Sequence, residues 1–186
     1  MGHHTFDPEK ASALEDQATR FRYLSVDELV WAASPTESST LADLGSGTGF
    51  YTREIAERAG TVYGVDVQEA MHEYHRESGV PENVELVTAG VADLPFADDE
   101  LDGAFSTMTF HEFATPAAMD ELGRVVASDG RVAIADWAAD GEGEAGPPVT
   151  ERYSLDDAID RFEAGGFEVE FGASRPETFL LVARAP

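Results

Sequence analysis

The sequence predicts a single α/β domain built on a doubly wound, mostly parallel sheet between two layers of helices. Segments typical of buried strands alternate with segments of helical periodicity from about residue 40 onward, and this βαβ order is typical of a parallel sheet covered on both faces. The 186 residues, 42% of them apolar, suffice for one core of ordinary domain size. A glycine-rich turn, D-L-G-S-G-T-G-F, follows the first expected strand directly, where open α/β sheets bind ligands.

Two helices are expected before the first strand. Asp7 and Pro8 supply an N-cap and a first helical position, and apolar residues recur at helical spacing after them. Ser25 and Glu28 form the S-V-D-E capping box of a second helix, which should end before the next proline. We therefore expect a helical cap over residues 1–36.

The core of the domain is expected over residues 37–137. Its link 89–100 is acidic, contains Pro95 and is too irregular for a long amphipathic helix. An Asp129-Gly130 turn should lead into the last strand of this core. The expected strands are residues 40–44, 61–65, 84–88, 101–108 and 131–137, and the expected helices are 48–59, 68–78 and one opened by Thr115 and Pro116.

The remaining residues, 138–186, are expected to form a loop, a helix and a terminal strand pair. Ser154 is a suitable N-cap for the helix, and Gly165-Gly166 should end it. The segments F-E-V-E-F and T-F-L-L-V-A-R then read as two strands joined by a proline-containing turn. We find no repeat and no second domain.

Composition limits the environment and the partners of the chain. It carries 37 acidic and 12 basic residues, a formal net charge of -25, and Lys10 is its only lysine. Such an excess favours a salt-rich, halophilic cytoplasm, since molar salt shortens the screening length to about 3 Å; an acidic protein from a mesophile is the alternative. The sequence has no cluster of basic residues of the kind that binds nucleic acid, and no apolar segment is as long as a membrane helix. Without cysteine there is no disulfide or thiolate metal site, and we predict no metal.

The glycine-rich turn distinguishes between several ligands. A phosphate-binding P-loop needs a lysine after its last glycine, and this turn has none. The dinucleotide fingerprint needs a third glycine where Phe50 stands. Asp43, two residues before Gly45, would repel a pyrophosphate but suits a ligand with an ammonium or sulfonium group. Strand-to-helix packing alone is the structural alternative for the glycines.

At this point the chain resembles the class I S-adenosylmethionine-dependent methyltransferases, in particular the type 11 methyltransferase domains. The resemblance covers residues 40–137 strongly and the terminal helix and strand pair more loosely. It implies a Rossmann-like three-layer α/β/α fold of seven strands with an antiparallel C-terminal strand, S-adenosylmethionine as the cofactor, and a single methyltransferase domain over residues 1–186 whose core, 37–137, binds that cofactor.

Two further motifs carry the resemblance. V-Y-G-V-D ends the second strand at Asp66, 21 residues after Gly45, where a carboxylate accepts the ribose hydroxyls. V-A-D-L-P-F places Asp93 against the adenine amino group and the Leu94 N–H against the ring. A helix N-cap is the alternative for Asp66, and turn formation is the alternative for Asp93. The cofactor contacts implied are Asp43, Gly45, Ser46, Gly47, Asp66, Val67, Asp93, Leu94 and Thr107.

The end of the fourth strand, F-S-T-M-T-F-H-E-F, is implied to lie beside the methionine part of the cofactor. Backbone carbonyls around Ser106 and Thr107 would then face its ammonium group. His111 is the candidate catalytic residue, because an imidazole of ordinary pKa about 6.5 can take a proton from a hydroxyl or an acidic carbon. Substrate orientation and packing are its alternatives. Glu112 is expected to face solvent, and His72 and His75 to be ordinary surface residues.

Methyl transfer to a small organic acceptor by in-line displacement is the predicted function. The strand end lacks the N-P-P-Y or D-P-P-Y typical of enzymes that methylate amide or base nitrogens. Residues 20–24 are the expected lip of the active site. A cofactor-binding or regulatory subunit without its own catalysis is one alternative, and a nicotinamide-dependent oxidoreductase is another. The acceptor and the oligomeric state are left open.

Overall fold

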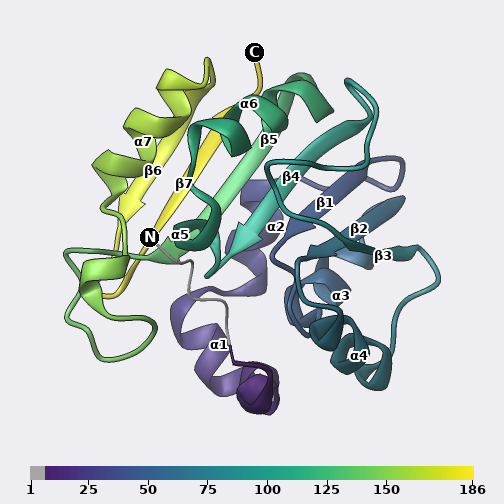
Figure 1. Cartoon of the computed structure of the whole chain (residues 1–186), viewed down its shortest axis with the longest axis horizontal. Helices are drawn as coiled ribbons and strands as arrows, with labels where there is room; N and C mark the ends of the chain where they lie inside the picture. Colours follow the sequence, from purple (N-terminus) through teal and green to yellow (C-terminus); the bar gives the residue numbers. More distant parts are fainter. Residues whose placement is uncertain (1–6) are drawn as a thin grey trace.

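The computed structural model describes residues 7–186 and contains one seven-stranded sheet in the order β3-β2-β1-β4-β5-β7-β6 (Figure 1). Five neighbouring strands pair in parallel, whereas β7 runs antiparallel to both β5 and β6. The predicted sheet with its antiparallel C-terminal strand is confirmed. The strands are β1 Thr40–Leu44, β2 Thr61–Asp66, β3 Val84–Thr88, β4 Leu101–Thr107, β5 Val126–Trp137, β6 Glu168–Ser174 and β7 Thr178–Arg184.

Helices cover both faces of this sheet, each over its own apolar core. Leu122 of α6 and Phe162 of α7 belong to one core cluster, and Leu29 of α2 and Ile55 of α3 belong to the other. All four side chains are fully buried. The helices are α1 Gln17–Tyr23, α2 Val26–Ala33, α3 Phe50–Ala56, α4 Glu69–Ser78, α5 Phe110–Phe113, α6 Pro116–Val125 and α7 Leu155–Ala164, with 3-10 helices η1 Pro8–Glu15 and η2 Val149–Glu151.

The capping signals placed two helices correctly. In the predicted box of α2, the Glu28 N–H donates to Ser25 Oγ at 3.3 Å and the Ser25 N–H donates to Glu28 Oε2 at 3.0 Å. Ser154 caps α7, and its box is closed by Asp157. The helix ends at Ala164 with Gly165 as C-cap, as the glycine pair predicts.

The N-terminal segment differs from the single helix expected after Asp7. Pro8–Glu15 forms a 3-10 helix, and α1 begins only at Gln17. Asp16 is the N-cap of α1, since its side chain accepts the Ala18 N–H at 3.1 Å and its backbone is extended, with φ -73 and ψ 97. An extended N-cap residue interrupts helical hydrogen bonding, which separates the two helices.

Two other elements depart from the prediction. The short helix α5 was not expected, because four residues carry no helical periodicity. β5 begins at Val126, directly after α6, so the expected Asp129-Gly130 turn lies within this strand. Asp129 has a φ of 64, which shows the bend that the Asp-Gly pair predicted.

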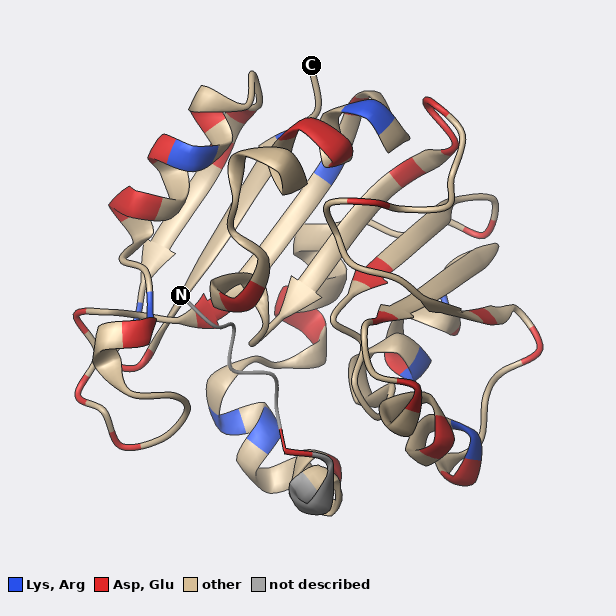
Figure 2. Ribbon diagram, in the orientation of Figure 1, with Lys and Arg blue, Asp and Glu red and all other residues tan. Residues whose placement is uncertain are grey.

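In the ribbon of Figure 2, acidic residues, in red, are spread over helices, strands and loops, and basic residues, in blue, are fewer. Within residues 7–186, no helix has the length and apolar character needed to cross a bilayer.

Candidate functional site

The candidate site lies at the carboxyl ends of β1 and β4. β1 has β2 on one side and β4 on the other, so the strand order reverses between this pair. Open α/β sheets bind ligands at such a reversal, beyond the carboxyl ends of the strands. Figure 1 shows α1 beneath the arrowhead of β4, across this edge of the sheet.

Three glycines shape the turn after β1, and each has a backbone conformation that favours glycine. Gly45, Gly47 and Gly49 have φ values of 78, 54 and 79. A Cβ at Gly45 would lie 2.3 Å from the Thr109 side chain, and one at Gly49 would lie 2.1 Å from the His75 ring. Packing therefore explains two of the glycines. Around Gly47 the nearest atom would be Leu14 Cδ1 at 3.7 Å, so this glycine leaves room beside the loop.

Asp66 joins the end of β2 to the glycine turn. Its Oδ2 accepts the Gly47 N–H and its Oδ1 accepts the Gln68 N–H, both at 2.9 Å. The second bond is a local turn contact, but the N-cap of α4 is Gln68, so Asp66 is not the helix N-cap that was the structural alternative. Val67, next in the chain, is 53% exposed, which is unusual for an apolar residue at a strand end.

Asp43 is a carboxylate enclosed by protein. It is 1% exposed, its Oδ2 accepts the Thr52 hydroxyl at 2.6 Å, and its Oδ1 has no hydrogen-bond partner among the described residues. Burial raises the pKa of Asp43 to about 7, with Asp66 adding to the effect and Thr52 and Arg20 opposing it. A buried oxygen without a partner is energetically costly, which makes it ready to accept a donor from a ligand.

Arg20 of α1 brings a positive charge to the same region. Its guanidinium lies over the rings of Phe50, at 5.6 Å, and Tyr51, at 4.8 Å. Burial lowers the pKa of this guanidinium, although Tyr51, Asp43 and Glu15 oppose the effect. The Nε atom is buried and lacks a hydrogen-bond partner among the described residues, as does Ser46 Oγ. Sequence patterns did not identify Arg20 as a binding residue, because it lies outside the glycine motif.

The end of β4 is closely tied to the turn after β1. Ser106 Oγ donates to the Leu44 carbonyl at 2.7 Å, and Thr109 Oγ1 donates to the carbonyls of Thr107, at 3.2 Å, and Gly45, at 3.3 Å. The carbonyl of Thr107 thus already accepts one hydrogen bond. Met108 has a φ of 60, and such strain in a residue other than glycine is typical of functional sites.

The predicted adenine contacts lie in the link after β3. Asp93 is exposed, and its N–H donates to the Gly90 carbonyl at 3.0 Å. The Leu94 N–H, expected to meet the adenine ring, donates instead to Glu121 Oε1 at 2.8 Å. Glu121 of α6 therefore occupies this donor, and the sequence gave no sign of a carboxylate from such a distant helix.

His111 is fixed by Asp136, at the end of β5. Its Nδ1 lies 3.0 Å from both carboxylate oxygens, and its backbone N–H donates to Asp136 Oδ2 at 2.6 Å. Asp136 is fully buried. Burial alone lowers the pKa of His111, but the hydrogen bond and charge of Asp136, with Glu112 and Glu151, raise it above its ordinary value. The Asp136 contact holds the imidazole through Nδ1 and leaves Nε2 for proton transfer.

Glu112 is not the solvent-facing residue that we expected. Its side chain is 19% exposed, and its Oε1 lies 4.0 Å from His111 Nε2. Burial raises the pKa of Glu112 to about 7; His111 opposes this effect, while Asp66 and Asp136 add to it. Two carboxylates therefore flank one imidazole.

The expected lip is present in residues 20–24. Tyr51 Oη donates to the carbonyls of Arg20, at 3.1 Å, and Leu24, at 2.7 Å, which binds the lip to α3. At the other side, the ring of Tyr23 packs edge-on against that of Trp137, with centroids 4.8 Å apart. The segment thus contacts both α3 and the end of β5, and its role as the lip of the active site stays a prediction.

His72 and His75 lie in the interior, contrary to the surface position we expected. Both are fully buried on α4, and neither has a hydrogen-bond partner for its ring nitrogens among the described residues. The His75 ring fills the space left by the missing side chain of Gly49. Burial, assisted by Arg53, His72 and Arg76, lowers the pKa of His75 to about 4, so this imidazole is neutral at physiological pH.

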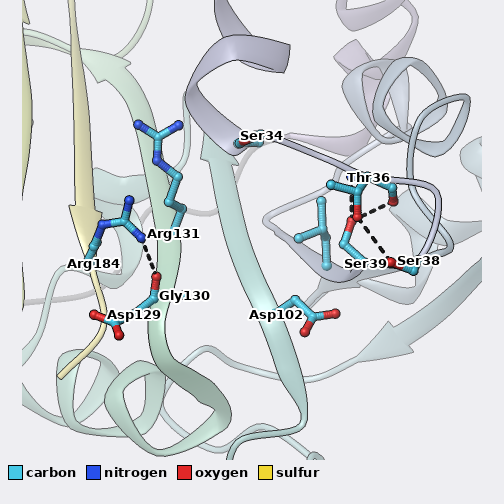
Figure 3. A pocket seen from close by; sticks show the side chains of 11 residues that line it. Ser34, Thr36, Ser38, Ser39, Asp102, Asp129, Gly130, Arg131 and Arg184 are labelled. Atoms are coloured by element: carbon cyan, nitrogen blue, oxygen red, sulfur yellow. Dashed lines mark hydrogen bonds between the residues drawn. The ribbon is translucent and has the colours of Figure 1, made fainter.

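A separate hollow of about 430 Å³ opens at the opposite edge of the sheet (Figure 3). Its polar groups bond to one another: Ser39 Oγ donates to the Thr36 carbonyl at 2.8 Å, and Arg184 Nη1 donates to the Asp129 carbonyl at 2.9 Å. Asp102, also in its wall, accepts the N–H of Thr40 at the start of β1. The hollow therefore lies at the amino ends of the strands, away from the glycine turn.

Comparison with known proteins agrees with this geometry. A family model described as a methyltransferase domain matches residues 42–134. A SAM-dependent methyltransferase from Aquifex aeolicus superposes with a TM-score of 0.88 and 30% identity, over 98% of this chain and 100% of that one.

Curated relatives are longer than this chain. A biotin biosynthesis bifunctional protein BioHC of Cellvibrio japonicus is 32% identical over 127 residues, which are 67% of this chain and 25% of that protein. A demethylmenaquinone methyltransferase of Clavibacter sepedonicus is 31% identical over 120 residues, 63% of this chain and 46% of that protein. The chain thus spans between a quarter and a half of these relatives. From the family match and the strand order together, the chain belongs to the class I S-adenosylmethionine-dependent methyltransferases, with a type 11 methyltransferase domain.

Proposed function

We propose that this chain transfers a methyl group from S-adenosylmethionine to a small organic acceptor, and that His111 removes a proton from that acceptor. The observation that carries the proposal is the contact of His111 with Asp136. A buried carboxylate fixes the imidazole through Nδ1, at 3.0 Å, and raises its proton affinity. An imidazole held in this way is suited to general base catalysis.

The unpartnered polar atoms around the glycine turn fit the amino-acid end of the cofactor. Asp43 Oδ1 is a buried acceptor suited to an ammonium group, and Arg20 Nε is a buried donor suited to a carboxylate. Gly47 has no side chain, so it leaves space beside the backbone of the glycine-rich loop. We assign the ribose to Asp66, an apolar contact to the exposed Val67 and the adenine amino group to Asp93.

When bound, S-adenosylmethionine supplies a methyl group on a positively charged sulfur and departs as a neutral thioether, so the protein need not protonate a leaving group. Alignment of the reactants is then the main requirement, and it can contribute about 7 to 11 kcal/mol. Tyr23 and Trp137 close the site over the acceptor and exclude water. His111 accepts the proton of a hydroxyl, an amine or an acidic carbon, a contribution of about 10²- to 10⁴-fold.

A small acceptor agrees with the site and with the relatives. The ring of Tyr23 in the expected lip contacts that of Trp137 at the end of β5, and Tyr51 holds Leu24 of the same segment, which is consistent with a lip that limits access to this edge of the sheet. One relative is named for demethylmenaquinone, a small organic acceptor. The acidic surface also disfavours nucleic acid.

Calorimetric titration in about 2 M KCl tests the cofactor. S-adenosylmethionine and S-adenosylhomocysteine should both bind, and NADH should not. Binding of NADH alone would refute the proposal in favour of an oxidoreductase.

Catalysis needs a second experiment, since a regulatory subunit would also bind the cofactor. The protein is incubated with S-adenosylmethionine carrying an isotopically labelled methyl group and with panels of phenols, amines and carboxylic acids, and products are detected by mass spectrometry. A labelled product that requires His111 supports the proposal. The regulatory alternative would be favoured if this protein binds the cofactor but labels no compound of the panels, while the Aquifex aeolicus relative labels one under the same conditions.

A further inference from the structure

The imidazole of His111 has a carboxylate on each side, and the two contacts differ. Asp136 lies within hydrogen-bond distance of Nδ1 and also accepts the N–H groups of His111, at 2.6 Å, and Trp137, at 2.8 Å. Its oxygens are thus fully engaged. Glu112 lies 4.0 Å from Nε2, too far for a direct hydrogen bond, and close enough for strong electrostatic coupling.

The charges that face this pair are nearly all negative. Asp66 from the end of β2 and Asp136 from β5 face Glu112, and Glu151 of η2 adds its charge at His111. Among the side chains that the structure describes, no arginine or lysine is a cause of the pKa shift of either group. When it is protonated, the His111 imidazole is therefore the cationic partner of Glu112, at 4.0 Å.

His111 and Glu112 consequently titrate as a unit. Burial raises the pKa of Glu112 to about 7, and Asp136 raises the pKa of His111 above its ordinary value. Glu112 changes charge near neutral pH, and because the two side chains lie 4.0 Å apart, the proton affinity of each depends on the charge of the other. A further positive charge brought into this poorly solvated site would expel a proton from the unit.

We propose that the His111–Glu112 pair exchanges one proton for the positive charge of the cofactor. The inference rests on the proposed function, because it requires a cofactor that is cationic before transfer and neutral after it. The pair gives a proton to solvent when the sulfonium form binds, which leaves His111 able to act as a base. It regains a proton when that charge is lost, and the net charge around the pair stays constant.

The proton balance of one turnover follows. As the acceptor forms its bond to the methyl carbon, the electron pair of the carbon–sulfur bond stays with sulfur, and the acceptor's proton passes to His111 Nε2. The site has then lost the sulfonium charge and gained a proton, without oxidation or reduction. The next charged cofactor drives that proton from the pair to water.

The affinities of S-adenosylmethionine and S-adenosylhomocysteine, measured by calorimetry between about pH 6 and about pH 8, test this inference without any acceptor. Both ligands carry the same ammonium group, so the contact of Asp43 with that group is common to both. The ratio of the two affinities reports the sulfonium charge, and variants of the pair separate its response from any response of Asp43. We expect the ratio to shift about tenfold toward S-adenosylmethionine as pH rises, because a shift of one pKa unit corresponds to tenfold in affinity. Titrations in buffers of different ionisation enthalpy should show more proton release with S-adenosylmethionine than with S-adenosylhomocysteine, approaching one proton per molecule where the pair is fully protonated before binding.

Variants assign the effect to the pair. In the double variant His111→Asn/Glu112→Gln the affinity ratio should become independent of pH, whereas Glu73→Gln, an exposed carboxylate on α4, should keep the wild-type dependence. Each single variant should retain part of it, since either remaining group still titrates. A double variant that fails to fold is replaced by an NMR titration of the wild-type His111 imidazole, whose apparent pKa should fall with S-adenosylmethionine and not with S-adenosylhomocysteine.

The outcomes separate this inference from the proposed function. A ratio that stays constant with pH in the wild type overturns the proton exchange and leaves the cofactor assignment intact. If neither S-adenosylmethionine nor S-adenosylhomocysteine binds, the proposed function itself is overturned.

Discussion

The carboxylate of Asp136 holds both the backbone and the side chain of His111: it accepts the backbone N–H at 2.6 Å and lies 3.0 Å from Nδ1. In Asp136→Asn the shape is kept and the charge is lost, so the pKa of His111 should fall, because Asp136 contributes most to raising it, ahead of Glu112 and Glu151. Methyl transfer should slow by about 10²- to 10⁴-fold, the usual contribution of a general base. NMR titration and turnover measure the two effects. Asp140→Asn, an exposed change nearby, should alter neither.

Replacement of Asp66 should weaken cofactor binding. Asp66→Ala leaves the N–H groups of Gly47 and Gln68 without their acceptor, and the proposed ribose hydroxyls as well. Each unsatisfied polar group in a dry site costs about 1 to 3 kcal/mol. We expect the dissociation constant of S-adenosylmethionine to rise at least about tenfold. Calorimetry gives the value, with Glu73→Ala as the control. An unchanged affinity would show that the ribose lies elsewhere.

Replacement of two glycines of the same turn by alanine should affect different properties, stability at Gly49 and cofactor affinity at Gly47. Gly49→Ala places a Cβ in the space of the His75 ring, so we expect the free energy of unfolding to fall by about 2 to 4 kcal/mol. Gly47→Ala has open space and should cost about 1 kcal/mol from its positive φ. Its effect should appear in cofactor affinity instead. Urea unfolding and calorimetry on both variants distinguish the two roles.

The buried imidazole of His75 should make stability depend on acid. Its pKa in the folded protein is about 4 against an ordinary 6.5, so below pH 6.5 the unfolded chain binds a proton that the folded protein does not. Stability due to this residue is complete above pH 6.5 and is lost as pH falls toward 4, by up to about 3 kcal/mol. In His75→Phe this part of the dependence should vanish. Urea unfolding at a series of pH values would contradict the assignment if both proteins lost stability equally.

Salt should stabilise this protein. With a formal net charge of -25, repulsion between surface carboxylates opposes folding and is screened as the salt concentration rises. The melting temperature should therefore increase by about 10 °C or more between about 0.2 M and about 2 M KCl. Scanning calorimetry in KCl and in sucrose of matched water activity isolates the ionic effect. A melting temperature that is the same at both KCl concentrations would remove the argument for a salt-rich environment.

Local signals were sufficient for much of the fold. The capping boxes of Ser25 and Ser154 depend on residues three apart, and the glycine turn follows its strand without interruption, so sequence alone located them. Asp16 was missed because the apolar spacing continues across it, although its side chain interrupts the helix there.

Contacts between distant segments were beyond such reasoning. His111 and Asp136 meet because β4 and β5 pair in a register that sets Thr107 beside Ala135, and nothing in either segment specifies that register. The burial of His75 likewise depends on a space created by Gly49 in another element. From the sequence we singled out His111 and expected His75 at the surface, but neither the contact of His111 with Asp136 nor the burial of His75 could be derived from the residues around them.

The position of β7 has a consequence for the order of folding. This strand is the last of the seven along the chain, yet it lies between β5 and β6 and is almost entirely buried. β6 pairs with the sheet only through β7, so α7 and β6 have no strand partner until residues 178–184 have been synthesised. During translation the β5 edge stays open for the whole of that interval, exposed to pairing with other chains. The β5 edge lies inside the finished sheet and is covered only when β7 is added. Repulsion between the many acidic side chains of neighbouring nascent chains should therefore limit wrong pairing at this edge.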